Sequence, residues 1–352
     1  MGPTFSSVPF GADQAMRHYA VFVVLSASVF MAGQASAQAV AGFYKGKTVV
    51  VVSPSDAGGS IYQYALTVAN YLGRHIPGSP TTIVQARPGG GGVTAANYVS
   101  KVGAKDGTVV AELHPQSLLT PITGKGASYD PRTFNWLGSV AIRSYVGAVW
   151  HTVNVKSLED MKDREYVFGG SGVASASYQY PMFLAHLTGA RIKVIPGYKS
   201  GGETNLAMER GEVQGRGNYY EAFLTTNPDW IHDKKVKFVF RLGPDHPDLA
   251  GVPAARQYAR TPKHQQMLAV LEAPLAIGQA FYVPREVPKE RVDALRDAFK
   301  KMLVDPEFVA ETQKIKLYVN PSGPAEIAEA VSRVYQTPKD ILAELDALLA
   351  PK

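Results

Sequence analysis

The chain has 352 residues, of which 45% are hydrophobic and 19% charged, a composition typical of a folded protein long enough for two domains. Its net charge is +6, but it has no run of Lys and Arg typical of nucleic-acid binding, and we expect no nucleic-acid partner. Because it contains no cysteine, disulfide frameworks, thiol catalysis and cysteine-ligated metal sites are excluded.

The N-terminus has the pattern of a secretory signal peptide. Arg17 and His18 precede an apolar segment, residues 19–33, which is shorter than the about 20 residues that a membrane span needs. The small residues ASA at 35–37 follow as a signal-peptidase site. We therefore expect residues 1–37 to be removed and the mature protein to be periplasmic, with a retained membrane anchor as the alternative.

Strands and helices alternate along the chain in two similar series. In the first, a run of four valines before Ser53 is typical of a strand buried on both faces, and the apolar residues that follow it recur at helical spacing. This series predicts strands at 47–54, 81–86 and 108–113 and helices at 60–76 and 93–102. Short connections of this kind imply parallel βαβ units.

The second series begins near Val146 and repeats the pattern. It predicts strands at 146–151, 165–170, 191–198 and 235–242, with helices at 157–163, 178–189 and within 201–213. The C-terminal part is helical, with expected helices at 287–303, 324–335 and 338–349. The chain is thus expected to be an α/β protein with two similar halves, on which the C-terminal helices pack.

Two loops occupy corresponding positions in the two halves. Residues 53–61 and 169–177 each leave a strand, are rich in small residues and enter a helix. Such a loop presents backbone N–H groups and a positive helix end to an anion, and its small residues allow close approach. If the two halves face each other, an anion in the cleft would be held from both sides.

Two motifs resemble those of enzymes but are better interpreted as loops without catalytic function. Residues 90–95 fit G-x-G-x-x-A, but the next strand ends in His114 instead of the acid that a dinucleotide site needs, so we expect a tight turn and no cofactor. Ser171 sits in a sequence where a nucleophile elbow would need glycine at Val173. A secreted serine hydrolase is therefore the alternative, and the preferred reading is a loop that binds a ligand without attacking it.

Two further side chains are candidates for ligand contact. The eight histidines show no metal-binding spacing, and no metal site is expected. His114 nevertheless ends the third strand, where ligands of parallel sheets bind. Arg216 lies in GRGNYYEAF, and either pairs with a carboxylate or is an exposed arginine beside a tyrosine core.

A series of short motifs runs in order through nearly the whole expected mature chain. The motifs occupy residues 53–62, 86–92, 106–108, 169–175, 198–201, 211–214, 248–255 and 281–308. The first motif, SPSDAGGSIY, loosely matches the pattern V-P-F-P-A-G-G-x-x-D. The second motif, ARPGGGG, matches the pattern N-R-P-G-x-G-G. Together they resemble the substrate-binding proteins of tripartite tricarboxylate transporters, the Bug receptors.

The resemblance implies a Venus-flytrap fold of the periplasmic-binding-protein type (type II), with two α/β domains around a ligand cleft. Domain 1 would contain residues 38–141 and 243–352, and domain 2 residues 142–242. The protein would be a monomeric receptor without enzyme activity or cofactor. It would deliver a small organic carboxylate to the large and small membrane subunits of a transporter. A ligand-binding input protein of a sensory system is a further alternative.

The two loops and the resemblance together define the expected ligand site. Its residues are Ser55, Asp56, Ala57, Gly58, Gly59, Ser60, His114, Gln116, Ser171, Gly172, Val173, Ala174, Ser175, Tyr198, Arg216 and Asn218.

The expected site departs from the family pattern where specificity is set. Ser55 and Asp56 replace the usual Phe-Pro, and Asn218 lies where amino-acid-binding members carry an acid, which counts against an amino-acid ligand. Arg216 and His114 are hypothesised to meet a second carboxylate. An inward carboxylate of Asp56 would repel an acid. We therefore expect this side chain to turn away from the cleft and cap the following helix, with solvent exposure or ligand selection as alternatives.

Overall fold

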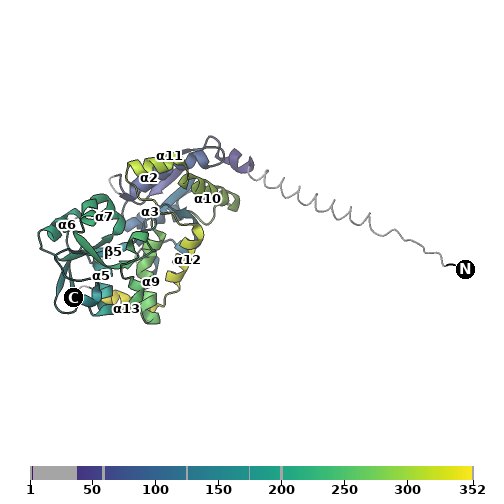
Figure 1. Ribbon diagram of the computed structural model, residues 1–352. Coiled ribbons are helices and arrows are strands. Elements are labelled where there is room, and N and C mark those ends of the chain that lie inside the picture. Colours follow the sequence, from purple (N-terminus) through teal and green to yellow (C-terminus); the bar gives the residue numbers. More distant parts are fainter. Residues whose placement is uncertain are drawn as a thin grey trace.

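The computed structural model describes residue 2 and residues 38–57, 60–123, 126–173, 175–198 and 201–350. The predicted signal peptide therefore lies outside the described residues, as do Gly58, Gly59 and Ala174 of the expected site. The described residues form two five-stranded sheets with helices packed around them (Figure 1). Within these residues, no helix combines the length and apolar character required to cross a membrane.

The first sheet has the strand order β2-β1-β3-β10-β4. Its strands are β1 (Thr48–Ser53), β2 (Thr81–Ala86), β3 (Val109–Leu113), β4 (Asn135–Ser139) and β10 (Ala280–Val283). β1 pairs in parallel with β2 and β3, which confirms the βαβ units predicted for this half. β10 comes from the C-terminal part of the chain and runs antiparallel between β3 and β4.

Helices cover both faces of the first sheet. α2 (Ser60–Leu72), α10 (Lys289–Leu303) and α11 (Pro306–Lys314) pack on the face that buries Val49 and Val51. α3 (Val93–Lys101), α12 (Pro324–Tyr335) and the end of α9 (Pro262–Ile277) pack on the opposite face, which buries Val52. Because both faces are covered, β1 contains an unbroken run of four valines rather than an alternation of apolar and polar residues.

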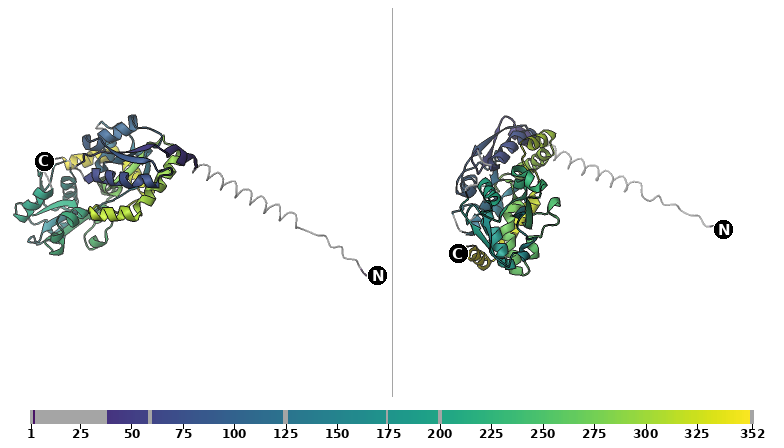
Figure 2. Two further views of the ribbon diagram at one scale, coloured as in Figure 1. Left: turned by 90° about the horizontal axis from the view of Figure 1, so that it is seen from above. Right: turned by 60° about the vertical axis from the view of Figure 1, so that its left-hand side comes forward.

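The second sheet has the strand order β7-β6-β8-β5-β9. Its strands are β5 (Tyr145–Trp150), β6 (Tyr166–Gly169), β7 (Ile192–Ile195), β8 (Gly215–Tyr219) and β9 (Val236–Leu242). β6 pairs in parallel with β7 and β8, and β5 runs antiparallel between β8 and β9. The elements of this sheet gather at one end of the molecule (Figure 2).

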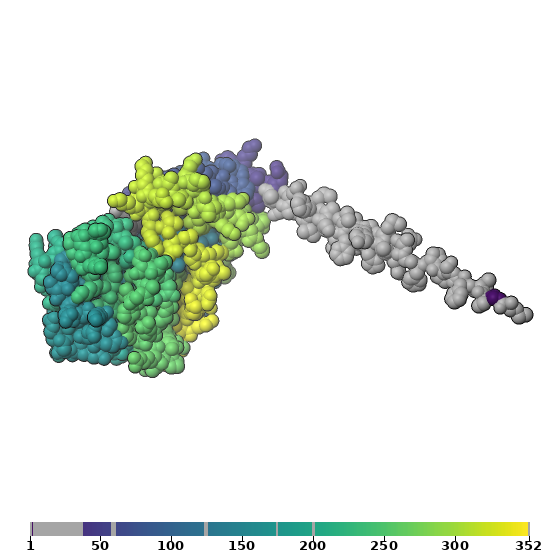
Figure 3. Space-filling model, viewed as in Figure 1, coloured from purple at the N-terminus to yellow at the C-terminus, as the bar shows by residue number. Residues whose placement is uncertain are grey.

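Each face of the second sheet has its own core. α5 (Ala176–Thr188) covers one face, and α6 (Gly201–Glu209), α7 (Tyr220–Thr226) and α8 (Pro228–His232) cover the other. The α5 core also contains Met267 of α9 and Leu345 of α13 (Lys339–Leu349). This core thus includes residues outside 142–242. In the space-filling view, the C-terminal residues, drawn in yellow, lie beside the green part of the chain (Figure 3).

The chain crosses between the sheets twice, after β4 and after β9. The two crossings touch, because the Ser144 hydroxyl donates to the Pro244 carbonyl at 2.9 Å. The Arg143 N–H also donates to the carbonyl of Leu275 in α9 at 3.2 Å. Gly278, which follows α9, has φ of +51°, and a Cβ there would lie 1.8 Å from the Ala141 carbonyl oxygen. Only glycine fits this close approach beside the first crossing.

Charged groups are buried beside these crossings. Glu112 of β3 is 2% exposed, and neither of its carboxylate oxygens has a hydrogen-bond partner among the described residues. Burial raises the pKa of Glu112 well above its ordinary value, against the opposing attraction of Arg143. Arg143 donates to the Tyr64 hydroxyl at 3.3 Å, and the Ser144 N–H donates to Glu221 at 3.0 Å. Elements of both sheets thus contribute to this cluster.

Candidate functional site

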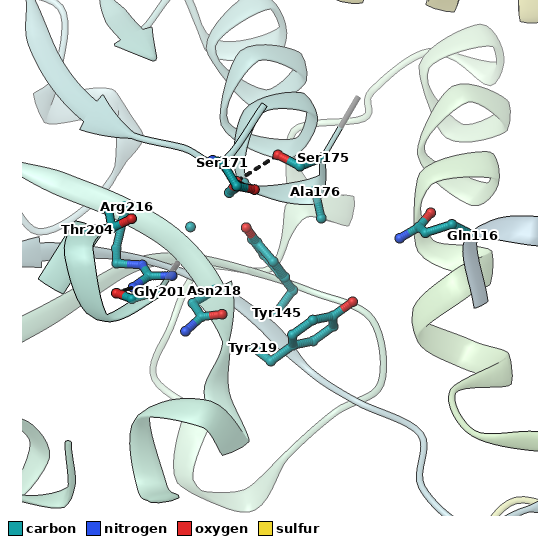
Figure 4. Close-up of a pocket in the computed structure, with 12 residues that line it drawn as sticks. Gln116, Tyr145, Ser171, Ser175, Ala176, Gly201, Thr204, Arg216, Asn218 and Tyr219 are labelled. Carbon is teal, nitrogen blue, oxygen red and sulfur yellow. Dashed lines mark hydrogen bonds between the residues drawn. The ribbon is translucent and has the colours of Figure 1, made fainter. Parts of the chain in front are cut away.

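A cavity of ≈ 340 Å³ lies at the edge of the second sheet where the parallel strands β6 and β8 end. Carboxyl ends of parallel strands are the usual ligand sites of open α/β sheets. The cavity brings together a subset of the predicted residues. These are Gln116, Ser171, Ser175, Arg216 and Asn218. Gln116 comes from the first sheet's side and faces the others across the cavity (Figure 4).

Ser171, Ser175 and Ser177, called here the serine cluster, line the cavity at the start of α5. The Ser177 hydroxyl accepts the Ser171 N–H at 3.0 Å and lies 2.7 Å from the Ser175 hydroxyl, which donates to the Gly172 carbonyl at 2.6 Å. The helix beyond them is 13 residues long, and its first turn presents backbone N–H groups. Hydroxyls and a positive helix end are therefore held together, an arrangement suited to an anion.

The serine cluster does not have the arrangement of a catalytic nucleophile. The Ser171 hydroxyl lies 3.2 Å from the Ser177 hydroxyl, and no histidine of the described residues is hydrogen-bonded to it. An activated serine needs an adjacent general base. The described residues also contain no group of three His, Asp or Glu side chains placed to hold a metal ion.

Arg216 of β8 is a buried cation for which the described part of the chain provides no acidic partner. It is 5% exposed, and its Nη1 donates to the Gly201 carbonyl at 2.6 Å and to the Asn205 side-chain oxygen. Its Nε has no partner, and no carboxylate among the described residues forms an ion pair with it. Burial lowers the pKa of Arg216, but a guanidinium keeps its charge in proteins. An anion in the cavity would compensate for this buried charge.

Tyr145, which begins β5, is a cavity residue that the sequence analysis missed. Its side chain is 2% exposed, and its hydroxyl has no hydrogen-bond partner among the described residues. Burial raises the pKa of Tyr145, so that the hydroxyl keeps its proton and remains a donor. A Cβ on Gly217 would lie 2.4 Å from this hydroxyl. The alternation of Gly215 and Gly217 in β8, which clears one face of the strand, is the sequence signal that would have pointed to a bulky neighbour.

The first predicted loop lies elsewhere. Asp56 and Ala57 are exposed, Ser55 is half-buried, and none of them lines the cavity at the second sheet. Ser60 begins α2. Gly58 and Gly59, which connect Asp56 to this helix, lie outside the described residues, so the predicted cap by Asp56 stays a prediction.

The remaining predicted residues have other neighbours. The Nδ1 of His114 accepts the Gln116 N–H at 3.3 Å, and burial lowers the pKa of this imidazole. Tyr198 packs beside Gly169, where a Cβ would lie 3.1 Å from its ring. Val173 is exposed, and Gly172 supplies the carbonyl that Ser175 binds. Ala174 is outside the described residues.

Comparison with known proteins supports a specific fold. No family model matches the sequence, and no curated protein matches it. Among solved structures, a TctC solute binding protein from Polaromonas, without ligand, is similar with a TM-score of 0.68 at 16% identity, covering 86% of this chain and 99% of that one. The periplasmic binding protein BugD has a TM-score of 0.55 at 19% identity, covering 86% and 98%.

MatC from Rhodopseudomonas palustris, with bound malate, has a TM-score of 0.54 at 17% identity, covering 86% of this chain and 99% of MatC. At these identities the similarity establishes the fold. The chain has the two-sheet α/β fold of periplasmic solute-binding proteins of the TctC and Bug type, which confirms the fold class expected from the motifs.

Proposed function

We propose that this protein is an extracytoplasmic solute-binding receptor of the tripartite tricarboxylate type and that it captures an organic carboxylate. The observation that carries the proposal is the buried guanidinium of Arg216, which has no carboxylate partner among the described residues and shares a cavity with the serine cluster. A buried charge is costly unless it is paired, and a carboxylate ligand would supply the pair. No Asp or Glu of the described residues lines this cavity to repel such a ligand.

Binding would couple to closure of the cleft. The two domains would be residues 38–141 with 243–352, and residues 142–242, joined by the crossings near 141 and 243. The serine cluster and Arg216 would bind the acid first, because both belong to the second sheet's side of the cavity. Closure would then bring Gln116 and the first loop, residues 53–61, onto the ligand from the opposite side. The buried charge of Arg216 would be paired with an opposite charge only when the ligand is bound.

The closed, liganded receptor would deliver the acid to the large and small membrane subunits of a transporter in the periplasmic compartment, and it would perform no chemistry itself. This step is supported by the similarity to a TctC solute binding protein and to BugD, a periplasmic binding protein. MatC, a protein of the same fold, was solved with malate, a small carboxylate.

A thermal-shift screen tests the proposed function. The purified protein would be heated with mono-, di- and tricarboxylates, and with the neutral amides of the same acids as controls. A ligand at 100 times its Kd stabilises the folded protein by about 2.7 kcal/mol, which raises the melting temperature measurably. We expect at least one acid, and none of the amides, to produce this rise. A panel in which no acid raises the melting temperature would contradict the proposal.

A further inference from the structure

Arg143, on the first crossing, lies between one tyrosine from each half of the protein. Its guanidinium carbon is 5.5 Å from the centre of the Tyr64 ring in α2 and 5.2 Å from that of Tyr219, which ends β8. Its Nη2 donates to the Tyr64 hydroxyl at 3.3 Å, and its Nε is buried without a partner among the described residues. Tyr219 also lines the cavity, across from Gln116 (Figure 4). Arg143 therefore contacts a wall of the ligand cavity.

Two buried acids lie near Arg143, one from each half of the protein. Glu221 of α7 accepts the N–H of Ser144, the next residue of the crossing, at 3.0 Å, and is thereby fixed to the crossing. Glu112 lies in β3, the middle strand of the first sheet, and its two oxygens have no hydrogen-bond partner among the described residues. Arg143 attracts Glu112 but is not hydrogen-bonded to it in this conformation. A buried cation and a buried carboxyl group left unpaired are costly, so a movement that joins them is favourable.

Glu112 is the acid whose ionisation such a movement would change. Burial holds the pKa of Glu112 well above 4.5, so its carboxyl group is protonated over a pH range in which an exposed glutamate is ionised. Arg143 is the cation that acts on it. The titratable and charged groups of the surrounding elements are Tyr64, Arg143, Tyr219, Glu221, His246 and Tyr318.

Closure of the cleft would move Glu112 toward Arg143. Gln116 follows β3 and lines the cavity from the first sheet's side, so a ligand that draws Gln116 toward the serine cluster also draws the end of β3. The crossing does not follow β3, because the bond from Ser144 to Glu221 holds it to the second sheet's side. The distance that changes is thus the one between Glu112 and Arg143, and the bond to Glu221 is carried along.

We propose that closure on the ligand pairs Glu112 with Arg143 and that the Glu112 carboxyl group then gives its proton to solvent, so that ligand binding is coupled to proton release. This inference rests on the proposed function, since it assigns a regulation of the same cavity. Arg143 acts as a positioning residue and does not touch the ligand. A guanidinium at bonding distance stabilises the ionised carboxylate, so the pKa of Glu112 falls on closure. Between the two pKa values of Glu112, the affinity should rise by up to about 10-fold per pH unit.

Isothermal titration calorimetry on the purified protein tests the inference. The probe is the acid that gives the largest rise in melting temperature in the thermal-shift screen. Titrations at pH 5.5, 6.5 and 7.5, each in two buffers with different enthalpies of ionisation, measure the protons released per acid bound. The variants are Glu112→Gln, Arg143→Met and Glu221→Gln. Glu272→Gln is the matched control, because burial also raises the pKa of Glu272, but its carboxylate already accepts the Gly243 N–H at 2.8 Å beside the second crossing. A melting curve for each variant verifies folding.

We expect the wild-type protein to release up to one proton more per bound acid than Glu112→Gln does, and its affinity relative to that variant to rise with pH. Protons from the ligand or from His114 are common to both proteins and cancel. Folded Arg143→Met should lose the same release, and Glu272→Gln and Glu221→Gln should keep it. If wild type and Glu112→Gln release equal numbers of protons at all three pH values, or if Glu221→Gln alone loses the release, the inference is wrong while the proposed function stands. If no acid binds, the proposed function itself fails.

Discussion

Replacement of Glu112 by glutamine should change how the stability of this protein depends on pH. Glu112 is 2% exposed in the middle strand of the first sheet, and neither carboxylate oxygen has a hydrogen-bond partner among the described residues. Ionisation of such a group is opposed by desolvation, which raises the pKa of Glu112 in the folded protein above its ordinary 4.5. Glutamine has nearly the same shape and remains neutral at every pH.

The sign and size of the effect follow from proton linkage. Between the pKa of Glu112 in the unfolded chain and its higher pKa in the folded protein, the folded state binds more protons. The contribution of Glu112 to stability is therefore fully present below pH 4.5 and is lost as pH rises through the folded pKa. Within this window the loss is up to about 1.4 kcal/mol per pH unit. Glu112→Gln lacks this loss. The free energy of unfolding of the variant, relative to that of the wild-type protein, should therefore increase as pH rises.

Urea denaturation of both proteins at pH 5, 6 and 7 measures the difference in the free energy of unfolding. We expect the difference, variant minus wild type, to increase with pH. Glu221 and Glu272, whose pKa values burial also raises, are common to both proteins and cancel in the comparison. The same exchange at Glu286, an exposed residue, controls for the loss of a surface charge. Parallel stability curves, with Glu112→Gln less stable at every pH, would show that Arg143 keeps Glu112 ionised and would refute the desolvation argument.

Two glycine substitutions test the packing of the site and of the crossing. Gly217→Ala places a Cβ 2.4 Å from the Tyr145 hydroxyl, so it should weaken carboxylate binding in calorimetry and cost about 1–3 kcal/mol of stability. Gly251→Ala, where a Cβ has open space, is the control, and unchanged affinity in Gly217→Ala would contradict a role of Tyr145 in the cavity. Gly278→Ala combines a positive φ with a contact of 1.8 Å to Ala141 and should cost at least about 2 kcal/mol in urea denaturation. The control Gly211→Ala has a positive φ in open space and should cost roughly 1 kcal/mol, so equal losses at both positions would show that the contact is relieved by a shift of the backbone.

Local patterns in the sequence determined the secondary structure of most elements and the position of one candidate binding loop. The valines of β1 predicted a buried strand, which the structure has. The glycine and serine residues after β6 predicted a turn before a helix, and the structure has hydrogen-bonded serines before and in the first turn of α5, whereas anion binding there stays a prediction. These signals depend on residues adjacent in the chain, where spacing alone defines a face or a turn. Arg216 was also named from the sequence, but the sequence did not decide whether it is an exposed residue or a ligand-binding one.

Only the tertiary structure decided which side chains share the cavity. Tyr145 and Arg216 are far apart in sequence, and they meet because β5 pairs with β8, a strand order set by long-range packing of the two cores. No local spacing records that pairing, so Tyr145 was missed. That Arg216 has no acidic partner among the described residues likewise depends on which side chains surround it in the fold. The sequence by itself determined most helices and strands and one candidate binding loop. The pairing of distant strands determined which side chains line the cavity.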